Sequence, residues 1–472
     1  MGISLNPSTL LSGQGINVSS LVNQILSESD GQLTEWQNEQ STLQTQAGDL
    51  TSINTDLSNL ATTVQALADP LGALAAQTAT SSDNSVLTAS ANAGAPAGTS
   101  QIVVNSLATS GTVYTDDFAG GPDATILPNG ATSGEIDLQI GGSGGTTQAI
   151  TITAGSNDTL NTLSSYINSQ NWGVTASVVT DATGSRLALV SQATGTPGAL
   201  AITANNTNLN FDTPAGGTNA SLTIDGIPYS STSNTITGAV SGVTLNLANA
   251  NPNETVSLSV GLDTTAVTDA INSFVAAYNQ VIGDINAQFT VDPTNNSEGP
   301  LGGDSSLEDL QSSLLSDAAY SISGNNGYVN LASLGINTNN DGTLTVDSSQ
   351  LASTLSSDPS AVQSFFQNAT STGFANNFNT DLTNQTNPTT GPLNTDLAQN
   401  SAEQQDLSTS ITNFETQLTA EQTQLTSQYD AVNASLEAYP LLLQEMTETL
   451  ATLSTNSSGT TSTASPTLTT GL

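Results

Sequence analysis

Residues 407–453 read LSTSITNFETQLTAEQTQLTSQYDAVNASLEAYPLLLQEMTETLATL, and apolar residues recur in them at alternating spacings of four and three. Glu421 is the one polar residue in this register, which continues for roughly six to seven heptads and predicts a long coiled-coil helix. Pro440 interrupts the pattern, and a proline inside a helix removes a hydrogen bond and bends the axis. We therefore expect a bend near Pro440, or separate helices on either side of it. The apolar positions are Leu407, Ile411, Phe414, Leu418, Leu425, Tyr429, Val432, Leu436, Tyr439, Leu443, Met446, Leu450 and Leu453.

A second heptad segment lies near the other end of the chain, where apolar residues over 33–67 again follow a spacing of three and four. Pro70 ends this segment. Two such helices at opposite ends of one chain are expected to pack against each other, with everything between them inserted at their far end. The apolar positions are Leu33, Trp36, Leu43, Ala47, Leu50, Ile53, Leu57, Leu60, Val64 and Leu67.

The middle of the chain, over residues 75–262, has the alternation of apolar and polar residues that is typical of β-strands. Clusters of Gly, Asn and Pro separate these runs as turns. A helical spacing of Leu160, Leu163, Tyr166 and Ile167 indicates one helix within this region. The clearest strands cover residues 101–104, 136–140, 150–153, 243–247 and 256–260.

After residue 263 the pattern becomes helical again. The sequence thus predicts an α+β fold, in which long terminal helices form a coiled-coil or helical-bundle stalk and mostly-β domains are inserted between them. The elements expected in this last part are an apolar helical stripe over 267–285, a helix over 307–318, a β-hairpin with Asp341 and Gly342 at its turn, and short helices around Leu351 and over 362–366.

The order of these patterns also divides the chain into segments. We expect residues 1–40 to be a flexible N-terminal segment and terminal helix; 41–74 the N-terminal part of the helical stalk; 75–106 and 216–262 the two parts of an inner β domain; 107–215 an outer β domain; 263–424 the C-terminal part of the stalk, with the hairpin; 425–455 the C-terminal coiled-coil helix; and 456–472 a disordered tail.

The composition excludes most enzyme chemistry. The 472 residues include one Lys or Arg, no His and no Cys, against 40 Asp plus Glu. Such a chain has no Ser-His-Asp triad, no thiolate nucleophile, no Schiff-base lysine and no imidazole metal site. A formal net charge of -39 argues against binding to nucleic acid or to an anionic membrane, and no apolar run is long enough for membrane insertion. We therefore expect a protein that is not an enzyme and has no cofactor and no metal.

Carboxylate chemistry and calcium binding are the alternatives that remain. Residues 337–342 have the first spacings of a calcium loop, but position twelve is Ser348, where a bidentate Glu is required, so a hairpin turn is favoured. The Gly-rich run over 141–145 has no Lys and no following helix signal, which favours a β connection over a phosphate loop. An acid-active glycosidase would need paired carboxylates, whereas the acids here are scattered and aromatic residues make up 4% of the chain.

The acidity has two interpretations. Charged residues make up 9% of the chain, against about 25% in a typical globular protein, because basic residues are missing while acidic ones stay sparse. A protein that works outside the cell in acid would lose most of this charge at roughly pH 2 to 3, below the ordinary carboxylate pKa values. Compositional drift in a lineage whose exported proteins avoid Lys and Arg explains the same numbers equally well.

Several short motifs, which are specific when they occur in this order, carry a family resemblance. They are residues 15–22 (GINVSSLV) with Ile25, Leu26 and Glu28; Asn234 and Ile236; 242–245 (GVTL); Asp263; 274–275 and 277–279 (FV and AYN); and 334–347 (LGINTNNDGTLTVD) with Leu351. Together they resemble the flagellar filament cap family, also called the hook-associated protein 2 family. Residues 173–178 (GVTASV) and 186–189 (RLAL), in the outer β domain, look like a module that recurs in flagellins and hook-associated proteins.

The resemblance implies a structural assembly protein of the bacterial flagellum. It implies a homo-oligomeric ring at the filament tip that promotes the folding and insertion of flagellin. The implied partners are further copies of the chain, flagellin, hook-filament junction proteins, the flagellar type III export apparatus and an export chaperone. It also implies an extracellular location at the filament tip, reached without a cleaved signal peptide. A hook-filament junction protein, and an adhesin or S-layer protein of an acid environment, are the alternatives.

The heptad stripes have two interpretations, packing within one chain and contact with neighbouring subunits or the filament. Under the second, the outermost segments, 18–43 and 425–453, make the contacts. Arg186, the only basic residue, is expected either to meet a nearby carboxylate such as Asp181 or to form an intersubunit contact. The candidate contact residues are Leu21, Ile25, Leu33, Trp36, Leu425, Tyr429, Val432, Leu436, Leu443, Met446, Leu450 and Arg186.

The acid interpretation predicts how assembly depends on pH. Because carboxylates lose their charge on protonation, self-association is expected to strengthen as the pH falls from neutral to about 3. Light scattering across this range measures it. Association that weakens steadily toward pH 3 would contradict the acid interpretation and leave compositional drift.

Overall fold

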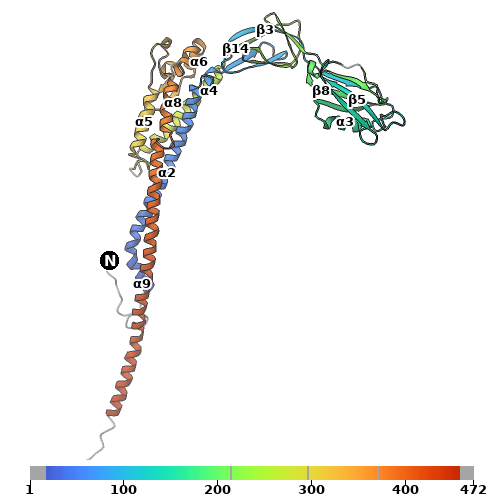
Figure 1. The fold of residues 1–472 in the computed structure, drawn as a ribbon. Coiled ribbons are helices and arrows are strands. Elements are labelled where there is room, and N and C mark those ends of the chain that lie inside the picture. The colour runs from blue at the N-terminus through green and yellow to red at the C-terminus, as the bar shows by residue number, and fades with distance from the viewer. Residues whose placement is uncertain (1–16, 213–214, 295–296, 369–371, 458–472) are drawn as a thin grey trace, which may run out of the picture. The chain divides into compact units, whose positions relative to one another are not determined.

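The computed structural model describes residues 17–212, 215–294, 297–368 and 372–457 (Figure 1). The expected flexible segment therefore lies outside the described residues over 1–16, and the expected tail does so over 458–472. The chain forms two compact units. The first consists of Met1–Asn59, Gln280–Leu314 and Leu382–Leu472, and the second of Leu60–Asn279 and Leu315–Asp381. The domain boundaries expected from the sequence stay predictions.

The first unit is built on two long helices, α2 (Val18–Ala68), most of which it contains, and α9 (Pro392–Ser457). Residue numbers in α9 fall as those in α2 rise, so the two helices are antiparallel and lie side by side (Figure 1). The prediction that the two heptad segments pack against each other is confirmed. The contacts are Val18, Val22 and Leu26 with Leu418, Leu425 and Tyr429; the rings of Trp36 and Phe414, whose centroids are 5.3 Å apart; Gln404 Nε2 with Leu43 O at 3.3 Å; and Asn54 Nδ2 with Asn394 Oδ1 at 3.0 Å.

Both helices extend beyond the heptad segments 33–67 and 407–453. Helix α2 begins at Val18, within the segment 1–40 that was expected to contain a flexible part and a terminal helix, and the Asn17 side chain accepts a hydrogen bond from Ser20 N at its start. Helix α9 begins at Pro392, before the heptad register starts, and ends at Ser457, two residues into the expected tail. It continues through Pro440, so separate helices are not found there. A bend at Pro440 stays a prediction.

Two antiparallel sheets come from the expected inner β domain, and both belong to the second unit. Their shared core consists of alternate residues of the strands, which is the half-buried pattern that the sequence predicted. One sheet has the order β1 (Gln77–Ser81), β14 (Val256–Leu262), β3 (Gly98–Ser106), β10 (Ala220–Ile224) and β11 (Ile227–Ser231); the other has the order β12 (Thr235–Val240), β13 (Val243–Leu247) and β2 (Leu87–Ala91).

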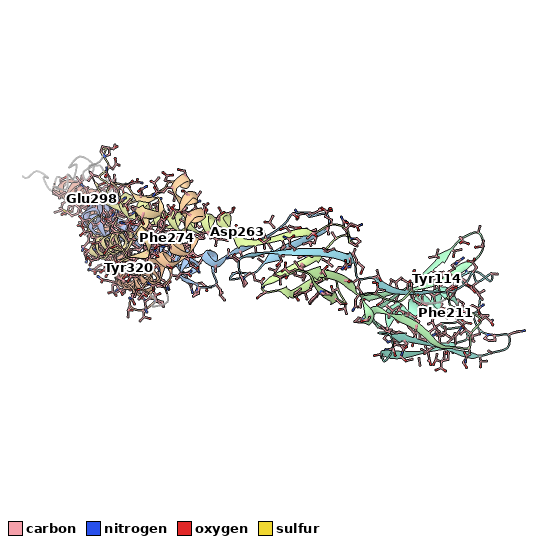
Figure 2. All side chains as sticks on the ribbon, turned by 90° about the horizontal axis from the view of Figure 1, so that it is seen from above. Tyr114, Phe211, Asp263, Phe274, Glu298 and Tyr320 are labelled. Carbon is pink, nitrogen blue, oxygen red and sulfur yellow. The ribbon has the colours of Figure 1, made fainter. Side chains whose placement is uncertain are left out.

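Two further sheets and a helix come from the expected outer β domain, which contains Tyr114 and Phe211 (Figure 2). Helix α3 (Leu160–Ser169) begins with a capping box between Thr159 and Thr162, and its apolar face is buried against the strands, as predicted. The Gly-rich run over 141–145 connects β5 to β6, also as predicted. The sheets have the orders β4 (Ser110–Tyr114), β8 (Ser185–Thr194), β7 (Val174–Thr180), and β6 (Thr146–Thr153), β5 (Ser133–Ile140), β9 (Leu200–Asn205).

The remaining elements are helical except for one hairpin. The predicted helices and the hairpin at Gly342 are present, whereas α8 was not predicted. They are α4 (Thr264–Phe289), α5 (Ser305–Ala318), β15 (Ile336–Thr338), β16 (Leu344–Val346), α6 (Ser348–Ser357), α7 (Pro359–Phe366), α8 (Phe374–Gln385) and the 3-10 turns η1 (Ala73–Ala75), η2 (Thr196–Gly198), η3 (Asn325–Gly327) and η4 (Leu331–Leu334).

A cluster of phenylalanines forms the helical core of the second unit. Phe374 lies at its centre and is fully buried. Its ring is stacked on that of Phe365 at 5.4 Å between centroids, and it meets three others edge-on: Phe274 at 5.7 Å, Phe366 at 5.7 Å and Phe378 at 5.6 Å. These contacts join α4, α7 and α8.

Replacing Phe374 with Ala is expected to lower the free energy of unfolding by about 3–5 kcal/mol, because it removes a buried ring and leaves a cavity. Urea unfolding followed by helical circular dichroism measures the loss. Tyr439→Ala is the control, since that side chain is 63% exposed. A loss below about 1 kcal/mol for Phe374→Ala would contradict the central role of this ring.

Candidate contact surface

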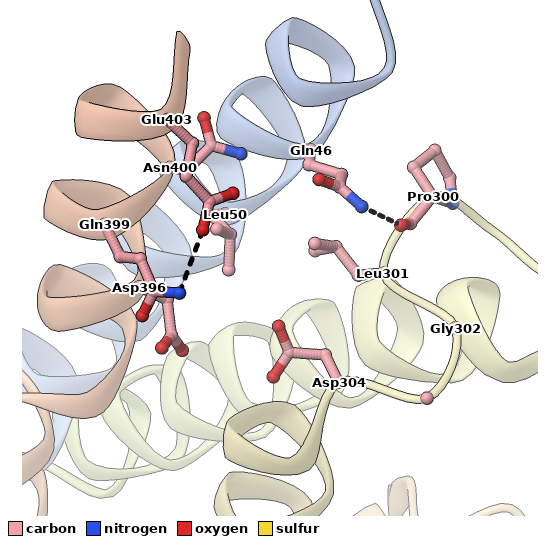
Figure 3. A pocket seen from close by; sticks show the side chains of 11 residues that line it. Gln46, Leu50, Pro300, Leu301, Gly302, Asp304, Asp396, Gln399, Asn400 and Glu403 are labelled. Carbon is pink, nitrogen blue, oxygen red and sulfur yellow. Dashed lines mark hydrogen bonds between the residues drawn. The ribbon is translucent and has the colours of Figure 1, made fainter. Parts of the chain in front are cut away.

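A polar cavity of about 300 Å³ lies in the first unit, between α2, α9 and the segment before α5 (Figure 3). Gln46 Nε2 donates to Pro300 O across it at 2.8 Å. Burial raises the pKa of Asp396, and the nearby charge of Asp304 adds to this, while a hydrogen bond with Ser306 opposes it. Across residues 17–212, 215–294, 297–368 and 372–457, no group of three or more His, Cys, Asp or Glu is placed to hold a metal ion. The cavity thus provides no argument for catalysis.

The most prominent surface of the first unit is an apolar row on the C-terminal part of α9. The last α9 residue that packs against the first turns of α2 is Tyr429, whereas α9 continues to Ser457. Beyond that point Leu436 is half-buried, and the other apolar heptad positions are exposed. This distal stripe consists of Val432 (48% exposed), Tyr439 (63%), Leu443 (56%), Met446 (52%), Leu450 (64%) and Leu453 (73%).

The charges on this part of α9 avoid the distal stripe. On a heptad wheel that places the stripe at the core positions, Glu437, Glu445 and Glu448 fall on the opposite side. The flanking positions carry no charge: Asn433, Ser435, Pro440, Leu442, Thr447, Thr449 and Ser454. Monomeric soluble proteins rarely expose a continuous apolar face of this length. The stripe is therefore a candidate binding surface.

The candidate contact residues of the two long helices form three groups, one in α2 and two in α9. In α2, Leu21 is buried and Ile25, Leu33 and Trp36 are half-buried. In α9, Leu425 and Tyr429 are half-buried against α2, and Leu436 is also half-buried. The third group is exposed and lies open to a partner, and its role in contacts stays a prediction. It comprises Val432, Leu443, Met446 and Leu450.

Exposed apolar residues that the sequence did not single out as contacts also lie here. Leu441 (69% exposed) and Leu442 (56% exposed) are outside the heptad register. Tyr439 and Leu453 are in the register, so the same signal that selected their neighbours could have selected them.

Arg186 lies on β8 of the outer β domain and forms a bidentate ion pair. Its Nε donates to Asp117 Oδ1 at 2.8 Å and its Nη2 to Asp117 Oδ2 at 2.9 Å. A carboxylate partner was predicted, but the choice of Asp181 was wrong, because the Asp181 side chain accepts hydrogen bonds from Thr183 instead. The hydrogen bonds and charge of Asp117 raise the pKa of Arg186 further. Both members of the pair belong to one chain, which favours the intramolecular interpretation.

Family models match both ends of the chain. The model described as "Flagellar hook-associated protein 2 N-terminus" matches residues 14–111, and "Flagellar hook-associated protein 2 C-terminus" matches residues 217–439. The chain belongs to the flagellar hook-associated protein 2 family. "Flagellin hook IN motif" matches residues 137–193, so the recurrent module expected in the outer β domain is also confirmed.

Individual members of the hook-associated protein 2 family agree with this. The B-type flagellar hook-associated protein 2 of Pseudomonas aeruginosa is 33% identical over 322 residues, covering 62% of this chain and 66% of that protein. Hook-associated protein 2 of Escherichia coli is 26% identical and covers 75% and 79%. The alignments with the first relatives thus span two thirds of their length or less, and as little as 22% for hook-associated protein 2 of Helicobacter pylori.

A solved structure in the same family has the same fold. The crystal structure of the D1-D2-D3 domains of the flagellar cap protein FliD from Escherichia coli matches with a TM-score of 0.61 at 26% identity, covering 75% of this chain and 99% of that chain. This confirms the predicted fold class. Among the described helices, none is long and apolar enough to cross a membrane.

Replacing Arg186 with Gln is expected to leave the mass of the protein in solution unchanged, because its carboxylate partner is in its own chain and the side chain is 39% exposed. Multi-angle light scattering of the variant measures this mass, with Asp117→Asn as the matched control. A lower mass for Arg186→Gln alone would show that the guanidinium has a second partner in a neighbouring subunit.

Proposed function

We propose that this chain is a structural assembly protein of the bacterial flagellum. In this proposal it forms a homo-oligomeric cap at the filament tip and promotes the folding and insertion of flagellin. Family membership supports it, as does the fold shared with the Escherichia coli flagellar cap protein. The single observation that carries it is the distal stripe, a long apolar helix face that is left open at the end of the chain.

The distal stripe suits a capping task for a physical reason. The apolar side chains of the stripe are about half exposed. When a partner removes their surface from water, the complex is stabilised by about 25 cal/mol for each Å² that is buried. Such contacts are not directional, so one stripe is able to exchange partners without rebuilding a set of hydrogen bonds. A cap that remains attached while subunits are added beneath it needs contacts of this kind.

The partners follow from the same proposal. They are further copies of this chain, flagellin, the hook-filament junction proteins, and the flagellar type III export apparatus with an export chaperone. The location is extracellular, at the filament tip, reached without a cleaved signal peptide. We also propose that the chain is not an enzyme, which its composition supports. The hook-filament junction alternative has less support, because the matching models describe hook-associated protein 2 at both ends of the chain.

A triple variant of the distal stripe tests the proposal. Leu443→Ser, Met446→Ser and Leu450→Ser together are expected to lower binding to filament ends at least tenfold, because they remove the exposed apolar face and leave the α2–α9 contact intact. Electron microscopy measures the fraction of filament ends that carry a cap.

The matched control alters the opposite face of the same helix segment, with Gln444→Ser, Glu448→Gln and Ala451→Ser. This variant is expected to cap as the unaltered chain does. Capping by the stripe variant at the level of the control would contradict the proposal.

A further inference from the structure

Asp317 is a buried acid at an unfavourable position. It lies in the last turn of α5, where the helix dipole opposes a negative charge, and it is only 8% exposed. Its Oδ1 accepts a long hydrogen bond of 3.4 Å from Asn377 Nδ2. Its Oδ2 is buried and receives no hydrogen bond from any donor among the described residues. A carboxylate held in this way calls for a specific explanation, because burying an unpaired charge costs several kcal/mol.

The group next to Asp317 is a second carboxyl. The side chain of Asp381, on α8, lies within hydrogen-bonding distance of the Asp317 side chain. Tyr278, on α4, is buried, and its pKa is raised by burial first and by the charge of Asp317 second. Tyr320, in the segment after α5, directs its hydroxyl away to Thr372 O. The chain's only basic side chain, Arg186, is paired with Asp117.

Two ionised carboxylates cannot hydrogen-bond each other, because neither has a proton to donate. A contact between them is favourable only when one carries a proton. We propose that Asp317 and Asp381 share a proton and form an acid-strengthened latch, which joins the end of α5 to α8 and loosens as the solution becomes alkaline. At both acids the proton enters from water and leaves to water, so the latch needs no other reactant.

The raised pKa of Asp317 agrees with a contact between the two carboxyl groups. Burial raises the pKa of Asp317 from 3.8 to about 7, with further contributions from the charge of Asp381 and from their hydrogen bond. A group whose pKa is raised on folding contributes stability that is full below the unfolded pKa. This contribution is lost as the pH rises toward the folded pKa. The latch is therefore complete below about pH 4 and lost above about pH 7.

Carboxylates at some other positions contribute stability that is lost in acid rather than in alkali. Asp347 caps α6 by accepting hydrogen bonds from Ser349 and Gln350, and these lower its pKa, as similar contacts do for Asp83 and Asp341. Their contribution is present above the unfolded pKa and is lost as the pH falls through the folded pKa. In mild acid the ionised helix caps and the latch both contribute stability. We therefore expect the helical part to be most stable there.

Hydrogen exchange at the end of α5 tests the latch in the full-length chain. The amides of Ala319 and Tyr320 donate to Leu315 O and Asp317 O, so their protection reports the last turn. After correction for the intrinsic pH dependence of exchange, the protection of these amides in the unaltered chain is expected to fall at least about tenfold between pH 5 and pH 8, because the pKa shift is roughly three units.

Asp317→Asn provides the decisive comparison, since its amide donates to Asp381 without needing a proton. This variant is expected to show the same protection at pH 5 and pH 8. Asp381→Asn is a second test of the same prediction, in case one variant does not fold. Asp309→Asn, an exposed acid on the same helix, is the control and is expected to behave as the unaltered chain.

The local readout also separates this latch from a weaker carboxyl pair in the first unit. There the pKa of Asp56 is raised by burial and by its contact with Asp284, so the melting temperature of the whole chain combines several groups. Equal pH dependence of Ala319 and Tyr320 protection in the unaltered chain and in both Asn variants would overturn the proposal. Protection in the unaltered chain that does not fall between pH 5 and pH 8 would do the same.

Discussion

The antiparallel contact between α2 and α9 is the interaction on which the rest of the structure depends. It joins residues that are far apart in the sequence, such as Leu43 and Gln404, which are separated by 361 positions. The entropy cost of closing such a loop grows only with the logarithm of its length, by about 0.6 kcal/mol for each doubling. Once the terminal helices pair, the β domains can therefore be inserted between them at little further cost, and each folds around its own core.

The sequence predicts which helices and strands are present better than it predicts where they begin and end. Heptad and alternating patterns identify the long helices and the main strands, because the same side chains that set the period are the ones buried. Helix α8 was missed, although Phe374, Phe378 and Leu382 follow a helical spacing, because Asn and Thr between them suggest a loop. The partner of Arg186 was missed because Asp117 is 69 residues away, and only the fold brings it closer than Asp181.

For the candidate contact surface, the sequence pattern does not predict which apolar residues are exposed. The period of apolar residues is the same where α2 covers α9 and where it does not, so the sequence pattern alone does not separate the distal stripe from the buried stripe. What separates them is the position of the first turn of α2 opposite α9. That position depends on the register of two segments from opposite ends of the chain, and no local pattern contains it.

In a chain with one basic residue, almost all acids must be stabilised without an ion pair. Several of them lie at the starts of helices instead. Asp263, Asp304, Asp347 and Asp358 each accept backbone hydrogen bonds in the first turn of a helix, where the dipole favours a negative charge. Asp317 lies at the other end of its helix, among side chains that include a second acid. The contrast is clearest between Asp347, whose pKa is lowered by hydrogen bonds at a helix start, and Asp317, whose pKa is raised by burial at a helix end.

The unequal lengths of α2 and α9 have a consequence for how the end of the chain folds. At 1.5 Å per residue, the part of α9 after Tyr429 extends for about 40 Å. This part contains Pro440, which removes a helix hydrogen bond, and most helical stability in proteins comes from a packed apolar face. A partner that covers the distal stripe therefore also stabilises this part of α9 as a helix, so its helical stability and its association are thermodynamically linked.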